Sequence, residues 1–114
     1  MSFRIQRAQA LIMEEISILV HHGLKDPRIK NVTITGVKLS ADLRNAVVYF
    51  SVLGGEQEIK SAKDGLDNAH GYIRKEIGHK IQLKYTPDFR FVYDDTLQKA
   101  AHITELLEKA KKNA

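Results

Sequence analysis

The stretch that decides the fold runs from Leu66 to Leu83 and reads Leu-Asp-Asn-Ala-His-Gly-Tyr-Ile-Arg-Lys-Glu-Ile-Gly-His-Lys-Ile-Gln-Leu. Around it, over residues 57–77, apolar residues recur in steps of three and four, which predicts an amphipathic helix. The apolar positions are Ile59, Ala62, Leu66, Ala69, Ile73 and Ile77. Gly71 interrupts this helix, since an internal glycine costs about 1 kcal/mol relative to alanine. We predict two helical pieces with a kink near Gly71, and Gly78 as the stop.

Polar and basic residues surround that glycine. Gly71 lies two positions beyond Ala69, so it points away from the apolar stripe and toward Asn68, Arg74 and Lys75. A helix break that lacks a side chain and is flanked by cations is a place where a phosphate backbone could come close. The sequence therefore nominates this break as a candidate nucleic-acid contact.

The composition describes one small basic domain over residues 1–114, without cysteine. A chain of this length can bury roughly 65% of its unfolded surface, enough for one core. The lack of cysteine excludes disulfides and thiolate metal sites and fits a reducing compartment. We find no signal-peptide pattern and no apolar run long enough for a membrane span, and expect a cytoplasmic protein.

Charge is segregated along the chain. The net charge is +4 and the sequence pI is about 9.4, which favours an anionic partner. Residues 69–90 carry a net +3, and residues 91–108 carry a net −3. Ordinary solvated faces explain this segregation equally well. The basic residues of the first segment are Arg74, Lys75, Lys80, Lys84 and Arg90.

The N-terminal half predicts a helix followed by a hairpin. Apolar spacing predicts a helix over residues 3–22, with Ser2 as its cap and Gly23 as its stop. Residues 32–39 and 46–53 predict two antiparallel strands with a bulge at Gly36. The apolar stripe of the helix contains Ile5, Ala8, Ile12, Ile16 and Leu19, widened by Leu11 and Val20.

A basic turn lies between that helix and the first strand. Asp26 followed by Pro27 is good chemistry for a type I turn. A turn has no need of Lys25, Arg28 and Lys30, so we nominate these three residues as a second edge for phosphate contacts.

The C-terminal half predicts one strand and one helix. Phe89, Phe91 and Tyr93 alternate on one face of a strand over residues 89–93, where they could stack on bases or pack in the core, and we favour the core. Asp95 and Gln98 have the spacing of a capping box for a last helix. The apolar positions of that helix are Leu97, Ala100, Ala101, Ile103, Leu107 and Ala110, and residues 109–114 form a frayed basic tail.

These elements predict an α+β domain of order α-β-β-α-α-β-α, with helices on one face of a three-stranded sheet. No motif nominates a nucleophile, a phosphate loop or a dinucleotide site. Asp94 and Asp95 could hold Mg²⁺ in a nuclease, but Asp95 is already assigned as a helix cap. A protein-interaction module that presents its basic face to an acidic partner is the other alternative.

The chain also resembles a known family over residues 4–108. The family is ribosome-binding factor A, a bacterial assembly factor of the small ribosomal subunit. The most telling matches are Ala69-His70-Gly71-Tyr72-Ile73-Arg74 and Pro87-Asp88-Phe89-x-Phe91-x-x-Asp94. Lys25-Asp26-Pro27-Arg28-Ile29 and Val32-Thr33-Ile34-Thr35-Gly36-Val37 match as well. The resemblance implies a type II KH-like fold in which an Ala-x-Gly kink, matched here by Ala69-His70-Gly71, replaces the Gly-x-x-Gly loop of ordinary KH domains.

The resemblance further implies a function without catalysis. It implies binding to free 30S subunits and 16S ribosomal RNA during late maturation, including processing of the RNA 5′ end, and a role in growth at low temperature. We expect a monomer with no cofactor, no bound metal and no small-molecule substrate. The candidate RNA contacts are His70, Gly71, Arg74, Lys75, Lys80, Lys84, Arg90, Lys25, Arg28 and Lys30.

Overall fold

The computed structural model describes residues 3–83, 85–96 and 104–110 of the chain. Its elements follow the predicted α+β order, with two extra helical turns, η1 and η2. They are α1 (Phe3–Ile18), η1 (Leu19–Gly23), η2 (Pro27–Ile29), β1 (Val32–Leu39), β2 (Asn45–Val52), α2 (Glu56–Asn68), α3 (His70–Lys80) and β3 (Asp88–Tyr93). This arrangement is consistent with the type II KH-like fold that the resemblance implies.

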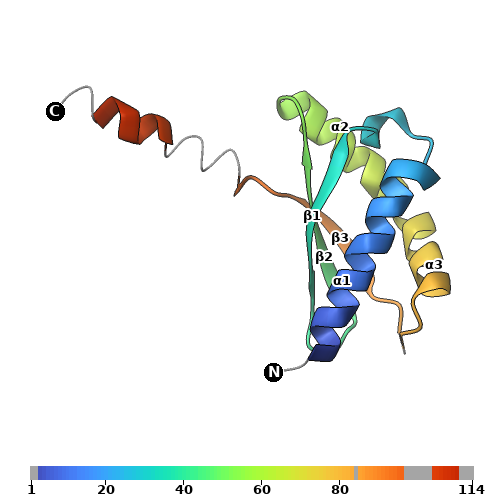
Figure 1. The fold of residues 1–114 in the computed structure, drawn as a ribbon. Coiled ribbons are helices and arrows are strands. Elements are labelled where there is room, and N and C mark those ends of the chain that lie inside the picture. Colours follow the sequence, from blue (N-terminus) through green and yellow to red (C-terminus); the bar gives the residue numbers. More distant parts are fainter. Residues whose placement is uncertain (1–2, 84, 97–103, 111–114) are drawn as a thin grey trace.

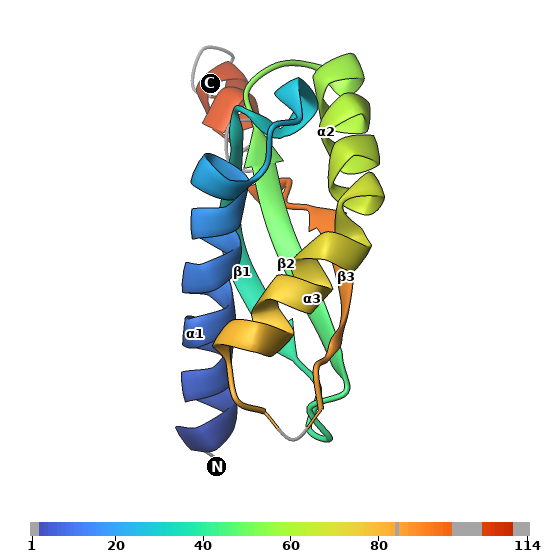
Figure 2. The same ribbon diagram turned by 90° about the vertical axis from the view of Figure 1, so that its right-hand side faces the viewer.

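The three strands form one mixed sheet in the order β1-β2-β3. β1 and β2 pair antiparallel as predicted, and the register shifts between Ile34 and Gly36, which confirms the bulge. β2 and β3 pair in parallel. Because parallel neighbours require a crossover connection, α2 and α3 together supply it. Helices α1, α2 and α3 all lie on one face of the sheet (Figures 1 and 2).

The core lies between that helical layer and the sheet. The predicted apolar stripes of α1, α2 and α3 are buried or half-buried, except that Leu11 is 49% exposed and does not widen the stripe of α1. Phe89 and Phe91 are buried, and Tyr93 is half-buried with its ring edge-on to Phe50, so the prediction of core packing is confirmed. The most deeply buried helical residues are Ile12, Ile16, Ala62, Leu66, Ile73 and Ile77.

The helix ends differ from the predictions in detail. The first helix changes to a π-helical turn after Ile18, and the helical segment ends at Gly23 as expected. Gly78 is not a stop, because α3 continues to Lys80. Gly78 serves close packing instead of ending the helix. A β-carbon at this position would fall 2.8 Å from Oγ1 of Thr86, so the missing side chain lets the loop before β3 pack against α3.

The C-terminal segment departs most from expectation. The Thr96 amide donates to Oδ1 of Asp94 at 3.0 Å, so Asp94 also contacts the start of this segment. The predicted capping box of Asp95 and Gln98 stays a prediction, because its second half lies outside the described residues. Residues 104–110 are helical, but all of them are exposed, and they lie on the side of the sheet opposite the three helices (Figure 1). The prediction of helices on one face of the sheet is confirmed for α1, α2 and α3, whereas this exposed segment covers neither face. The predicted cap Ser2, along with Lys84, Gln98 and the helical positions 97–103, lies outside the described residues.

No helix among residues 3–83, 85–96 and 104–110 combines the length and the apolar character that crossing a membrane requires.

Candidate nucleic-acid interface

The break between α2 and α3 is a single residue. Ala69 adopts φ −87° and ψ 0°, which ends one helix and starts the next. The prediction of two helical pieces is confirmed, whereas its position was two residues too late, because Gly71 lies inside the first turn of α3. Leu66 and Ile73 are both buried on either side of the break, so it changes the course of the chain without interrupting the apolar stripe.

The N-terminus of α3 is open to approach. Ala69 makes no side-chain cap, and the first turn contains no acidic residue. A β-carbon at Gly71 would meet nothing within 4 Å, so the backbone there borders open space. The first amides of a helix have no partner within the helix, and the helix dipole places partial positive charge on them. This end of α3 therefore has the chemistry of an anion-binding site.

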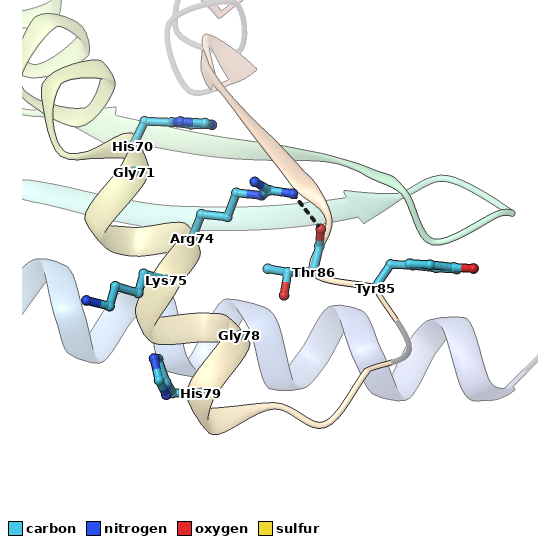
Figure 3. A pocket seen from close by; sticks show the side chains of 8 residues that line it. All are labelled: His70, Gly71, Arg74, Lys75, Gly78, His79, Tyr85 and Thr86. Carbon is cyan, nitrogen blue, oxygen red and sulfur yellow. Dashed lines mark hydrogen bonds between the residues drawn. The ribbon is translucent and has the colours of Figure 1, made fainter.

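Arg74 connects α3 to the loop before β3. Its Nη2 donates to the carbonyl oxygen of Thr86 at 3.3 Å, and its Nε donates to that of Pro87 at 3.4 Å. The side chain extends from the helix toward this loop, as Figure 3 shows. Both hydrogen bonds are long and therefore weak. They orient the guanidinium, and its remaining N–H groups can donate to a further acceptor.

Lys75 is the next residue of α3 and projects from a different side of the helix. It is exposed and points away from the loop that holds Arg74 (Figure 3). His79 follows one turn later and is also exposed. These side chains border a hollow of about 650 Å³. Gly71 and Gly78 also line it, and neither has a side chain that would fill it. Its lining consists of His70, Gly71, Arg74, Lys75, Gly78, His79, Tyr85 and Thr86.

The far wall of the hollow contains residues that sequence reasoning missed. Tyr85 is 47% exposed, and the guanidinium of Arg44 lies 4.9 Å from its ring centre, within the range of a cation–π contact. His70 Nε2 lies 3.2 Å from Asp88 Oδ1, a contact that becomes an ion pair when the imidazole is protonated. Helical spacing could have found His79, which stands four residues after Lys75, but no local pattern indicates Tyr85.

Two other predicted contacts lie elsewhere. Lys80 Nζ is 3.4 Å from Glu15 Oε2, so this lysine ties α3 to α1. Arg90 alternates along β3 with the buried Phe89 and Phe91, and it therefore lies on the face of the sheet that carries no helices. The structure thus places Arg90 on the other face of the sheet from the hollow, so Arg90 does not extend the basic surface around Arg74.

The basic turn is built differently from expectation. The Asp26 carboxylate caps η2, accepting from the Arg28 amide at 2.9 Å, and it also accepts from Nη2 of the Arg28 side chain at 2.7 Å. The guanidinium lowers the pKa of Asp26 by hydrogen bonding, and the carboxylate raises the pKa of Arg28. The prediction that the turn has no need of Arg28 was wrong. Lys25 and Lys30 are exposed and remain candidates.

Asp94, the first residue of the acidic pair near the C-terminus, makes structural contacts. Its carboxylate accepts a hydrogen bond from Thr35 Oγ1 at 2.7 Å, besides that from the Thr96 amide. Within the described part of the chain, no three histidine, aspartate or glutamate side chains gather as a metal site would require.

Comparison with known proteins adds two kinds of finding. A family model described as ribosome-binding factor A matches residues 4–107. The ribosome-binding factor A of Halothermothrix orenii is 46% identical over 108 residues, which cover 95% of this chain and 88% of that protein. The corresponding protein of Thioalkalivibrio sulfidiphilus is 42% identical over 107 residues, which cover 94% of this chain and 83% of that protein.

Solved structures agree with the fold. The solution structure of a putative ribosome binding factor A from Thermotoga maritima is 36% identical, with a TM-score of 0.61, over 79% of this chain and 82% of that one. The crystal structure of ribosome-binding factor A from Thermus thermophilus is 20% identical with a TM-score of 0.71, over 78% of this chain and 94% of that one, and so supports the fold alone.

Proposed function

The chain belongs to the ribosome-binding factor A family, and on this basis we propose that it binds the free 30S ribosomal subunit by contacting 16S ribosomal RNA. The α3 face is the proposed contact surface, defined as the first turn of α3 with Arg74, Lys75 and His79. The observation that carries the proposal is the uncapped helix N-terminus at Ala69, which borders open space at Gly71 and is followed by two cations.

The chemistry of this face suits an RNA backbone better than a base edge. Helix amides, a guanidinium and an ammonium group all favour phosphate oxygens. The hollow also contains the exposed ring of Tyr85, which could stack on an unpaired base. Phosphate contacts of this kind position a protein on RNA without reading sequence, so selectivity for the subunit would come from the shape of the RNA.

A structural relative supports the choice of partner. A homology model of the Thermus thermophilus ribosome binding factor A has been fitted into a cryo-electron microscopy map of its complex with the 30S subunit. That model shares the fold of this chain, with a TM-score of 0.63 at 21% identity. The same partner is the natural proposal for this chain, because the family is shared.

We propose further that binding serves late maturation of the 30S subunit, including processing of the 5′ end of 16S ribosomal RNA, and supports growth at low temperature. Proteins that hold RNA in one arrangement matter most in the cold, where RNA misfolding is harder to escape. No catalytic step is proposed for the chain. A strain that lacks the protein should accumulate 16S precursor and grow poorly in the cold, and both defects should be reversed by the wild-type gene.

Co-sedimentation tests the binding proposal directly. Purified protein is mixed with purified 30S subunits, with 50S subunits and with naked 16S ribosomal RNA, each over a series of salt concentrations. We expect saturable binding to 30S subunits, with log K falling by about 0.7–0.9 per neutralised phosphate for each unit of log salt. Equal binding to 30S and 50S subunits, or none to 30S subunits, would overturn the proposal.

A further inference from the structure

The outer side of α1 carries exposed apolar residues in addition to the buried stripe that faces the sheet. Phe3 is 76% exposed, Leu11 is 49% exposed and Ile18 is 41% exposed. They stand eight and seven residues apart, close to two helical turns each time, and therefore lie on one side of the helix. We call this side the α1 face. Large apolar residues gathered on the outer side of an amphipathic helix are typical of a contact with another protein.

A groove runs beside the α1 face. It lies between the first turns of α1 and the segment that follows α3, and its volume is about 480 Å³. Its inner part is apolar, because Ala8 and Ile81 are buried there and Leu83 is half-buried. Phe3 and Leu11 also line it, so the groove continues the apolar surface of the α1 face inward. Figure 2 shows the end of α3 coming close to α1 in this part of the molecule.

The cations at the groove specify the charge of a partner. Arg4 and Arg7 line the groove and are exposed, and neither guanidinium has a hydrogen-bond or ion-pair partner among the described residues. Lys80 lines it too, but its Nζ lies 3.4 Å from Oε2 of Glu15. The free guanidinium groups therefore favour a partner that has carboxylates next to its apolar side chains.

The α1 face suits a protein better than RNA. Glu14 is exposed on the same side of the helix, three residues after Leu11 and four before Ile18, where its carboxylate would repel a phosphate backbone. Arginine and aromatic residues are enriched in protein interfaces, whereas lysine is depleted. The α3 face differs in both respects, because the first turn of α3 has no acidic residue and Lys75 belongs to that face.

We propose that the α1 face and its groove bind a protein segment of the 30S subunit in which apolar side chains stand next to carboxylates. The apolar side chains pack on Phe3 and Leu11 and enter the groove, and the carboxylates pair with Arg4 and Arg7. Because α1 and α3 belong to the same layer of helices (Figure 2), a particle made of RNA and protein can contact both faces at once. This inference rests on the proposed binding to the 30S subunit and adds a protein contact to the RNA contact of the α3 face.

Photo-cross-linking within the 30S complex tests the proposal. The chain has no cysteine, so a benzophenone maleimide reacts only with an introduced thiol. Leu11→Cys places the label on the α1 face, and the control Lys60→Cys places it on an exposed position of α2. After irradiation with purified 30S subunits, we expect the label at position 11 to give a product that survives ribonuclease and contains a ribosomal protein by mass spectrometry. The label at position 60 should not give this product.

The other products of the label at position 11 would overturn the proposal. A product that ribonuclease returns to the size of the free chain would show that RNA covers the face. A product that joins two copies of the chain would show that the occupant is a second copy. Absence of any product in a complex that still co-sediments would show that the face is uncovered. If the wild-type protein does not co-sediment at all, the proposed function fails, and this inference fails with it.

Two leucine variants separate an apolar contact from a phosphate contact. Leu11 and Leu53 are both exposed, so Leu11→Ser and Leu53→Ser should leave the fold intact, as circular dichroism would confirm. We expect Leu11→Ser to weaken binding to 30S subunits about tenfold without changing the salt slope of log K, because an apolar contact releases no counterions. Leu53→Ser should keep the wild-type affinity. Equal affinities of the wild type and Leu11→Ser, or a salt slope that falls with Leu11→Ser, would overturn the proposal.

Discussion

Gly65 of α2 packs so closely on Ile29 of η2 that a β-carbon on the glycine would fall 2.9 Å from Cγ2 of the isoleucine. Ile29 is only 1% exposed, so its side chain has little room to move. The contact lies four residues before Ala69, about one helical turn. It therefore joins the basic turn to the end of α2 and helps to fix where the second half of the crossover begins.

This contact predicts the effect of Gly65→Ala. Alanine favours a helix by about 1 kcal/mol, but overpacking a filled contact costs about 1–3 kcal/mol. We expect a net loss of unfolding free energy of about 1 kcal/mol, measured by urea denaturation. Gly71→Ala is the matched control, since open space at that position leaves only the helix-favouring effect and should raise stability. If both substitutions raise the unfolding free energy, then the Ile29 side chain moves aside at little energetic cost.

Gly71 itself predicts a separation of binding from folding. Valine and glycine differ by less than about 0.5 kcal/mol in helix propensity, so Gly71→Val should leave the urea midpoint nearly unchanged. If the RNA backbone approaches the first turn of α3, the added side chain should weaken binding to 30S subunits about tenfold, which corresponds to about 1.4 kcal/mol. Parallel losses of stability and affinity would count against a role for Gly71 in contacting RNA.

The Asp26–Arg28 pair predicts a dependence on pH. The pKa of Asp26 is lowered in the folded protein, chiefly by the hydrogen bonds from the Arg28 side chain. The stabilisation from this carboxylate is therefore present above its unfolded pKa of about 3.9 and is lost as the pH falls through the folded value. Arg28→Ala should raise the pKa of Asp26 toward the ordinary value, as nuclear magnetic resonance titration would measure. An unchanged pKa would contradict the assigned cause.

Much of the fold could be predicted because its signals are local. Stripes with helical period identified all three helices of the layer, and the phase shift at Gly36 located the bulge. The break lies at Ala69 and not at Gly71, because the helix propensity of a single glycine is a weak signal that tertiary packing of the apolar stripe overrides. The parallel pairing of β2 with β3 depends on contacts between residues far apart in sequence, and no local pattern specifies it.

The candidate site was predicted only in part, for a similar reason. Counting charge along residues 69–90 grouped Arg90 with Arg74, although the alternation with Phe89 and Phe91 already indicated the other face. Charge along a sequence says nothing about which face a residue occupies. The ion pairs of Arg28 with Asp26 and of Lys80 with Glu15 depend on side-chain geometry, which cannot be deduced from composition.

The most direct test of the proposed RNA contact uses Lys75 and a matched lysine elsewhere. Arg74 is less suitable, because its hydrogen bonds to the loop before β3 give it a structural role as well. Lys75→Glu and Lys60→Glu make the same change of charge on two exposed helical positions, one on the α3 face and one on α2. Thermal denaturation should confirm that both variants are folded.

Affinity of these two variants for purified 30S subunits is then measured across a salt series. We expect Lys75→Glu to weaken binding and to lower the salt slope of log K by about 0.7–0.9, which corresponds to the loss of one phosphate contact, while Lys60→Glu keeps the wild-type slope. If both variants weaken binding to the same degree with unchanged slopes, then only the overall charge matters and the α3 face does not contact the RNA.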